Sequence, residues 1–229
     1  MISVDEIVSI ESIECTSKRY DITVEDNHNF FANGILVHNC QNLTTELLHW
    51  TVDELTWERT EKLDGTSMTV YLRDNEFGVC GRNWELTETD SNSLWRVARA
   101  SKIEQSLRDF GRHLAIQGEL IGEGIQGNPY KLKGQHFYVF DMYDISTGMY
   151  LSALDRVTLA AQFKLNHAPD EGTITLPLDA TAGKLLIEAE GKSKLCGTTE
   201  REGIVYKCVE DPSISFKVIS NKFLLKTGG

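Results

Sequence analysis

The stretch Glu61-Lys62-Leu63-Asp64-Gly65 decides how most of this chain is interpreted. It follows a predicted strand and ends in a glycine, which permits a tight turn and lets another molecule approach the backbone closely. A lysine that attacks phosphorus needs a depressed pKa, which neighbouring cations supply. A surface turn with an exposed lysine explains the same five residues equally well. The stretch must therefore be weighed together with the rest of the chain.

The sequence around this stretch predicts one domain of mixed α and β structure over residues 40–229. Alternating apolar residues predict strands, and apolar residues three or four positions apart predict helices. No internal repeat or low-complexity tract interrupts the pattern. The predicted strands are 68–72, 136–143, 203–208 and 214–219, and the predicted helices are 102–114 and one that runs from the capping box Ser152-Ala-Leu-Asp155 to about Lys164.

Four further motifs follow Glu61-Lys62-Leu63-Asp64-Gly65 in order along the chain. They are Gln117-Gly118-Glu119-Leu120-Ile121-Gly122-Glu123-Gly124-Ile125-Gln126-Gly127-Asn128, Phe137-Tyr138-Val139-Phe140-Asp141, Glu202-Gly203-Ile204-Val205-Tyr206-Lys207 and Ser215-Phe216-Lys217-Val218-Ile219-Ser220-Asn221-Lys222. Together the five resemble the motifs of the covalent nucleotidyltransferases. Within that superfamily they resemble ATP-dependent RNA ligases, in the branch whose adenylyltransferase domain follows an N-terminal OB domain.

This resemblance implies a fold of ATP-grasp-like antiparallel sheets with helices, and a role for each matching residue. Lys62 would attack the α-phosphate of ATP and become lysyl-AMP, while Lys207 and Lys217 would neutralise phosphate charge. Mg²⁺ is the expected metal. The remaining implied roles concern nucleotide and metal binding: Glu61, Asp64 and Gly65 in the nucleotide site, Arg82 on a phosphate, Glu119 on a ribose hydroxyl, Phe140 stacked on adenine, and Glu202 placing the metal and Lys62.

Two features of the sequence weaken parts of this assignment. Ile219 stands where the family usually has a second basic residue, which leaves the role of Lys222 in doubt. Phe137 and Phe140 alternate on a predicted strand, and either could be a core aromatic residue instead of a ligand contact.

Residues 1–39 have a different character, with β-branched residues and turn formers that predict short strands. Phe30-Phe31, Asn33-Gly34 and Ile35-Leu36-Val37 predict a hairpin. A segment of 39 residues is too short to bury a stable core alone. It is therefore expected to need a partner.

The segment ends in His38-Asn39-Cys40, a sequence with the groups for peptide-bond cleavage. The Asn39 side chain can attack its own carbonyl and break the bond to Cys40, with His38 assisting the proton transfer. The Cys40 thiolate can capture an upstream acyl group. Taken alone, the tripeptide could equally be a chance loop.

The longer stretch from Tyr20 to Cys40 resembles the last two sequence blocks of inteins, over 21 residues. The resemblance implies a small all-β segment of the Hint fold, in which Asp21 and His28 assist cleavage, Asn39 cyclises and Cys40 begins the downstream extein. The other intein half is not in the sequence, so the segment resembles the C-terminal half of a split intein; a truncation introduced by an experimenter would look the same.

Composition sets wider limits. The formal net charge of −11 argues against indiscriminate nucleic-acid binding, although a local basic groove is compatible with it. Five cysteines without CxxC spacing argue against a disulfide framework or a zinc site. No apolar run is long enough to span a bilayer and no signal peptide is recognised, so a cytoplasmic location, in a phage or its bacterial host, is expected.

We therefore expect an α+β chain with a split-intein C-fragment over 1–39 and an RNA ligase adenylyltransferase domain over 40–229. The expected partners are a second chain with the intein N-half and the OB portion of the ligase, and nicked or broken nucleic acid, with RNA preferred. Two alternatives remain: a DNA ligase or capping nucleotidyltransferase, and a splicing precursor whose ligase part is inactive until joined.

Overall fold

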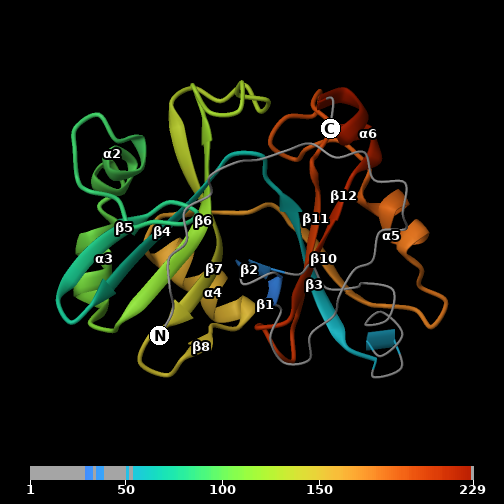
Figure 1. Cartoon of the computed structure of the whole chain (residues 1–229), viewed down its shortest axis with the longest axis horizontal. Coiled ribbons are helices and arrows are strands. Elements are labelled where there is room, and N and C mark those ends of the chain that lie inside the picture. The colour runs from blue at the N-terminus through green and yellow to red at the C-terminus, as the bar shows by residue number, and fades with distance from the viewer. Residues whose placement is uncertain (1–28, 33–34, 39–49, 52–53, 228–229) are drawn as a thin grey trace. The chain divides into compact units, whose positions relative to one another are not determined.

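The computed structural model describes residues 29–32, 35–38, 50–51 and 54–227 (Figure 1). It divides the chain into two compact units, Met1–Asn42 and Leu43–Gly229. This division falls three residues beyond the predicted boundary at 39. The predicted strands before residue 29 lie outside the described residues.

In the first unit, the described residues form a two-stranded antiparallel hairpin. β1 (Asn29–Ala32) pairs with β2 (Ile35–His38), with Asn29 opposite His38 and Ala32 opposite Ile35. The predicted hairpin is confirmed. Of the predicted splicing residues, Asp21, His28, Asn39 and Cys40 lie outside the described residues, and the side chain of His38 does too.

The described residues of the second unit form two sheets. The smaller sheet has the strand order β10-β3-β11-β12, and all its pairings are antiparallel. Its strands are β3 (Thr56–Lys62), β10 (Asp170–Thr175), β11 (Gly203–Cys208) and β12 (Ser215–Ile219). Because β3 and β11 are central, the two strands that carry Lys62 and Lys207 lie side by side.

The larger sheet has the order β5-β4-β6-β7-β8, and a short strand, β9, pairs with β7 in parallel. One face is apolar: Met68, Val70 and Leu72 alternate inward on β4, as the sequence predicts. The other face is partly exposed. The strands are β4 (Thr66–Arg73), β5 (Glu76–Cys80), β6 (Leu114–Gly122), β7 (Gln135–Asp144), β8 (Met149–Tyr150) and β9 (Asn166–His167).

Helices cover the apolar face of each sheet. The larger sheet packs against α2 (Ser93–Ala100), α3 (Ile103–Phe110) and α4 (Ala153–Gln162) in one core. The smaller sheet packs against α5 (Ala182–Ala189) in a second core, and α6 (Asn221–Thr227) follows β12. Figure 1 shows α2 and α3 beside the larger sheet and α5 and α6 beside the smaller one.

The helix predicted over 102–114 is too long. α3 ends at Phe110 because Gly111 adopts a left-handed conformation, with φ of 72°, and donates its N–H to the Leu107 carbonyl. Leu114 belongs to β6, where it is buried. Leu114 follows Phe110 by four positions, which is the spacing of an apolar stripe on a helix. Here the spacing is a coincidence, because Leu114 is apolar for another reason: its side chain faces the core from a strand.

The other predicted elements of this unit are confirmed. Ser152 caps α4 by accepting a hydrogen bond from the Asp155 N–H at 3.1 Å, which is the predicted capping box. Among the described residues, no helix is long and apolar enough to cross a membrane.

Candidate active site

The turn after β3 places Lys62 at the end of a central strand. Gly65 is required there because a Cβ atom at this position would lie 2.4 Å from the Leu120 carbonyl oxygen. The turn is thus pressed against β6, and no larger residue fits without moving one of the two backbones. This close approach of the two backbones explains why the turn after Lys62 contains a glycine at position 65.

Lys62 forms an ion pair with Glu202. The Nζ atom lies 2.5 Å from Glu202 Oε1, and both side chains are largely buried. Gly203, next to Glu202, is paired with Lys62 across β3 and β11. Burial raises the pKa of Glu202, although the Lys62 charge opposes that shift.

A cavity of about 220 Å³ opens beside this ion pair. Sequence reasoning assigned five of its lining residues to the site, and the structure brings them together. They are Glu61, Lys62, Glu119, Phe140 and Lys207; the rest of the wall is Glu58, Thr60, Leu63, Asp141, Ala168, Val205 and Ser215. The wall combines an exposed aromatic ring with cations and carboxylates, the mixture expected of a ligand site.

Glu119 carries the largest carboxylate shift near the cavity. Burial raises its pKa to about 7, with the negative charges of Glu202 and Asp64 adding to the effect and Lys62 opposing it. Glu119 therefore changes its charge near neutral pH. A perturbed carboxylate in a cavity is typical of functional sites.

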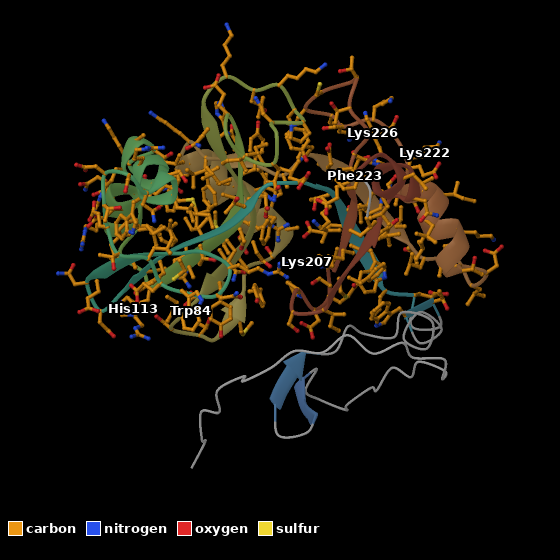
Figure 2. The ribbon with its side chains drawn as sticks, turned by 45° about the horizontal axis from the view of Figure 1, so that its top comes forward. Trp84, His113, Lys207, Lys222, Phe223 and Lys226 are labelled. Atoms are coloured by element: carbon orange, nitrogen blue, oxygen red, sulfur yellow. The ribbon has the colours of Figure 1, made fainter. Side chains whose placement is uncertain are left out.

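Lys207 lines the cavity, but its ammonium group is already paired with a carboxylate. It forms a buried ion pair with Asp141, and its Nζ atom also lies 4.9 Å from the centre of the Tyr150 ring. Burial lowers the pKa of Lys207 and raises the pKa of Asp141, so desolvation outweighs their mutual attraction. Figure 2 shows Lys207 near the middle of the second unit, apart from Lys222 on α6.

A second buried ion pair lies next to the cavity. Arg156 is fully buried, and its Nη2 atom lies 2.5 Å from Glu58 Oε1. Its Nε atom is 3.1 Å from His167 Nε2. The positive charge of Arg156 lowers the pKa of Lys207, which places the two pairs in electrostatic contact.

Five predicted residues of this unit do not line the cavity: Asp64, Gly65, Arg82, Glu202 and Lys217. Lys217 is exposed on β12, but it lies on the same face of the strand as Ser215, and its charge lowers the pKa of Glu202. Arg82 is exposed after β5 and does not line the cavity. The doubtful Lys222 pairs with Glu190 at 2.7 Å.

Sequence reasoning missed several residues of the wall. Glu58 and Thr60 precede Lys62 by four and two positions, so strand alternation alone could have placed them on the same face. Asp141 follows Phe140 directly, yet nothing in the sequence reveals its ion pair. Arg156, which pairs with the wall residue Glu58 but does not itself line the cavity, comes from α4, and no local pattern predicts that a charged helical residue lies fully buried.

The predicted metal position can be tested against Glu202. Its Oε2 atom is buried without a hydrogen-bond partner, so it has a free acceptor for a cation. Within the part of the chain that the structure describes, no group of three acidic, histidine or cysteine side chains could hold a metal ion. The residues therefore fit a Mg²⁺ ion that has few protein ligands and takes the others from phosphates and water.

Comparison with known proteins agrees with this geometry. The family model described as RNA ligase matches residues 55–219. A Naegleria gruberi RNA ligase mutant solved with ATP and Mn is 43% identical, with a TM-score of 0.77 over 82% of this chain. Another mutant of it, solved with AMP and Mn, is 45% identical with a TM-score of 0.75. The chain spans 56% and 55% of those two ligase chains.

Two curated proteins match shorter segments. A DNA topoisomerase 1 of Pyrococcus furiosus is 55% identical over 40 residues, which are 18% of this chain and 4% of that protein. A tRNA-splicing ligase RtcB of Methanocaldococcus jannaschii is 44% identical over 59 residues, or 23% of this chain and 6% of that protein.

Proposed function

The chain belongs to the RNA ligase family, and from this premise we propose that residues 40–229 are the adenylyltransferase domain of an ATP-dependent RNA ligase. The observation that carries the proposal is the Lys62–Glu202 ion pair beside a cavity that also contains Phe140, Glu119 and Lys207. The Naegleria structures with ATP and with AMP support the choice of nucleotide.

Lys62 is the nucleophile in this proposal. Its Nζ atom attacks the α-phosphorus of ATP, a phosphorus–nitrogen bond forms, and the bond to the β-phosphate oxygen breaks to release pyrophosphate. Glu202 Oε1, 2.5 Å from Nζ, orients the amine and takes up its proton. The raised pKa of Glu202 suits that second role.

The other cavity residues hold the nucleotide. Phe140 presents a ring that is 36% exposed, which can stack on adenine. Glu119 accepts a hydrogen bond from a ribose hydroxyl. Lys207 and Lys217 balance phosphate charge, and Lys207 would exchange its contact with Asp141 for one with the nucleotide.

A Mg²⁺ ion, when bound, would offset charge on the phosphates and the leaving pyrophosphate. Glu202 Oε2 is the oxygen that can hold it. The adenylylated lysine would then pass AMP to a 5′-phosphate, and a 3′-hydroxyl would displace AMP to seal the strand. An OB portion on a partner chain and a broken RNA complete the proposed assembly.

Incubation of the chain with α-³²P-labelled ATP tests the proposal. Wild-type protein should retain label after denaturation, and Lys62→Ala should retain none. Lys184→Ala, which removes an exposed lysine on α5, is the matched control and should label like the wild type. Preferential uptake of label from GTP would favour a capping enzyme. A wild-type chain that takes up no label until its OB partner is added would favour the splicing-precursor alternative.

We also propose that residues 1–39 are the C-terminal fragment of a split intein that splices in trans at Asn39 and Cys40. The β1–β2 hairpin supports this, since a strand that ends at His38 leads directly into the junction. Addition of the cognate N-terminal half should release a fragment of about 39 residues, and release from Asn39→Ala would disprove the assignment.

A further inference from the structure

The connection between β6 and β7, residues 123–134, is a compact loop whose two ends meet. The Glu123 N–H donates to the Gly134 carbonyl at 2.9 Å, and Gln135 Nε2 donates to the Glu123 carbonyl at the same distance. Loops of this length with adjoining ends pack on their own side chains and are frequently functional.

Internal hydrogen bonds fix the shape of the 123–134 loop. The Asn128 side chain accepts from the Leu132 N–H at 3.1 Å and donates to the Leu132 carbonyl at 2.9 Å. Ile125 is buried in the core of the larger sheet. The loop is therefore held both by itself and by the sheet, and it can serve as a rigid support.

Two side chains of the loop reach the turn that follows Lys62. The Tyr130 hydroxyl accepts a hydrogen bond from the Asp64 N–H at 2.6 Å, and Gln126 Nε2 donates to the Gly65 carbonyl at 3.2 Å. Tyr130 is only 3% exposed and packs with Leu63 in a small separate core. The Tyr130 hydroxyl is therefore largely shielded from water, and a hydrogen bond from a backbone N–H to such a group is costly to lose.

The loop also touches residues 193–199, which support the other side of Lys62. Thr199 Oγ1 donates to the Pro129 carbonyl at 2.7 Å, and Lys131 Nζ lies 3.1 Å from Thr198 Oγ1. The Lys194 N–H in turn donates to Glu61 Oε2 at 2.8 Å. Leu63, which follows Lys62, therefore packs on the 123–134 loop, and Glu61, which precedes it, is bonded to the 193–199 segment. These two segments also contact each other.

We propose that Tyr130 is a positioning residue that aims Lys62 at the α-phosphorus, which rests on the proposed function of Lys62. Its hydroxyl fixes the Asp64 N–H, two residues beyond Lys62, and so fixes the backbone at the end of β3. A reacting group must be held to within about 0.5 Å, and misplacement by about 1 Å can cost about a hundredfold in rate. Tyr130 itself does not line the cavity and needs no contact with ATP.

The test is Tyr130→Phe in the full chain. The variant keeps the buried ring and removes only the oxygen that accepts from Asp64. Tyr206→Phe is the matched control, because Tyr206 is a fully buried tyrosine whose hydroxyl has no hydrogen-bond partner among the described residues. Both variants lose one buried hydroxyl, but only Tyr130→Phe also leaves the Asp64 N–H without its acceptor, so its folded fraction must be measured separately from its rate.

Single-turnover formation of lysyl-AMP with α-³²P-labelled ATP separates positioning from stability. We expect the rate constant of Tyr130→Phe to fall tenfold to a hundredfold, with a full labelling amplitude and an ATP concentration for half-maximal rate within threefold of the wild type. Tyr206→Phe should keep the wild-type rate constant. Gln126→Ala should lose about two- to fivefold, since Gln126 is exposed.

A reduced amplitude with an unchanged rate constant would mean that Tyr130 only maintains the folded fraction, and the proposal would be overturned. Equal rate constants for Tyr130→Phe and wild type would overturn it as well. Failure of the proposed function looks different, because the wild type itself would then take up no label, or Lys62→Ala would take up as much as the wild type.

Discussion

At the scale of single residues, each lysine of the cavity already has an acidic partner. Lys62 pairs with Glu202, and Lys207 pairs with Asp141. These pairs balance the buried charge of the free protein, and a bound nucleotide must compete with the carboxylates for the lysines. The chain has a net charge of −11, yet it can offer the positive charges of Lys62 and Lys207 to phosphate groups at the cavity.

Glu119 gives a prediction about pH. Its pKa is about 7 in the folded chain and near 4.5 when unfolded, so the folded state binds the proton more tightly. Stability from this group is full below about pH 4.5 and is lost as the pH rises through 7, by at most roughly 3 kcal/mol. Glu119→Gln stays neutral, so its free energy of unfolding should rise relative to the wild type between pH 4.5 and 8.

Urea unfolding of both proteins at a series of pH values measures this difference. Glu88→Gln is the control, because Arg99 lowers the pKa of that exposed carboxyl instead of raising it. A stability difference between Glu119→Gln and wild type that stays constant from pH 4.5 to 8 would contradict the raised pKa.

The Asp141–Lys207 pair gives a second prediction. Asp141→Asn leaves the Lys207 charge buried without its partner, which should lower the free energy of unfolding by about 3–5 kcal/mol. Adding Lys207→Met to that variant should restore most of the loss, since the pair together is close to neutral in its net contribution. Chemical unfolding of the two single variants and the double variant measures the coupling.

An exposed pair provides the comparison. Lys184 and Asp179 contact each other on the surface, with side chains 55% and 74% exposed. Lys184→Met should change stability by less than about 1 kcal/mol. Additive effects of Asp141→Asn and Lys207→Met would show that the buried contact has no energetic role.

The sequence predicted the residues of the site better than their contacts. Lys62, Glu119, Phe140 and Lys207 all line one cavity, as their motifs suggested. Their partners could not be predicted, because an ion pair such as that of Arg156 with Glu58 joins positions 98 residues apart. Arg82 shows the opposite limit: the family resemblance implied a phosphate contact for it, but the structure leaves it outside the cavity wall.

At the scale of elements, period and caps predicted only part of the second unit: β4, β7, β11, β12, α3 and α4 were expected, whereas strands such as β5, β6 and β10 and the helices α2, α5 and α6 were not. β4 was predicted by alternation and α4 by its capping box, and both signals are local. The end of α3 was missed because the apolar stripe continued into a strand. The pairing of β3 with β11 depends on contacts between distant segments and could not be read from either strand alone.

The turn between β3 and β4 gives a third prediction. Gly65→Ala would bring a Cβ atom to 2.4 Å from the Leu120 carbonyl oxygen, and one backbone segment must move. We expect a loss of about 1–3 kcal/mol of stability, together with loss of labelling by ATP, since the same turn sets the position of Lys62.

Gly183→Ala is the matched control in α5, where the nearest atom to a new Cβ lies 3.9 Å away. Alanine is the better helix former, so this variant should be up to about 1 kcal/mol more stable. If Gly65→Ala matched the wild type in both stability and labelling, the close packing of the turn on β6 would not matter for activity.

At the scale of the whole molecule, the chain has two units, and the described cores belong to one of them. All buried apolar residues assigned to those cores lie between Trp50 and Val218, within the unit Leu43–Gly229. The predicted boundary at Asn39 and Cys40 would therefore separate residues with different chemical tasks. Cleavage there should leave the ligase cores whole.

Removal of residues 1–39 is the fourth prediction and tests that boundary. Because none of the described core residues is lost, the shortened chain should unfold in one main transition within about 2 °C of the corresponding transition of the full chain. A stability change of 1 kcal/mol would shift the midpoint by about 2–4 °C in a domain of this size. Calorimetry of both proteins measures the shift, and ATP labelling of Lys62 should proceed at the same rate in both. A midpoint more than 4 °C lower, with slower labelling, would mean that the first 39 residues are part of the ligase and are not a segment that leaves it.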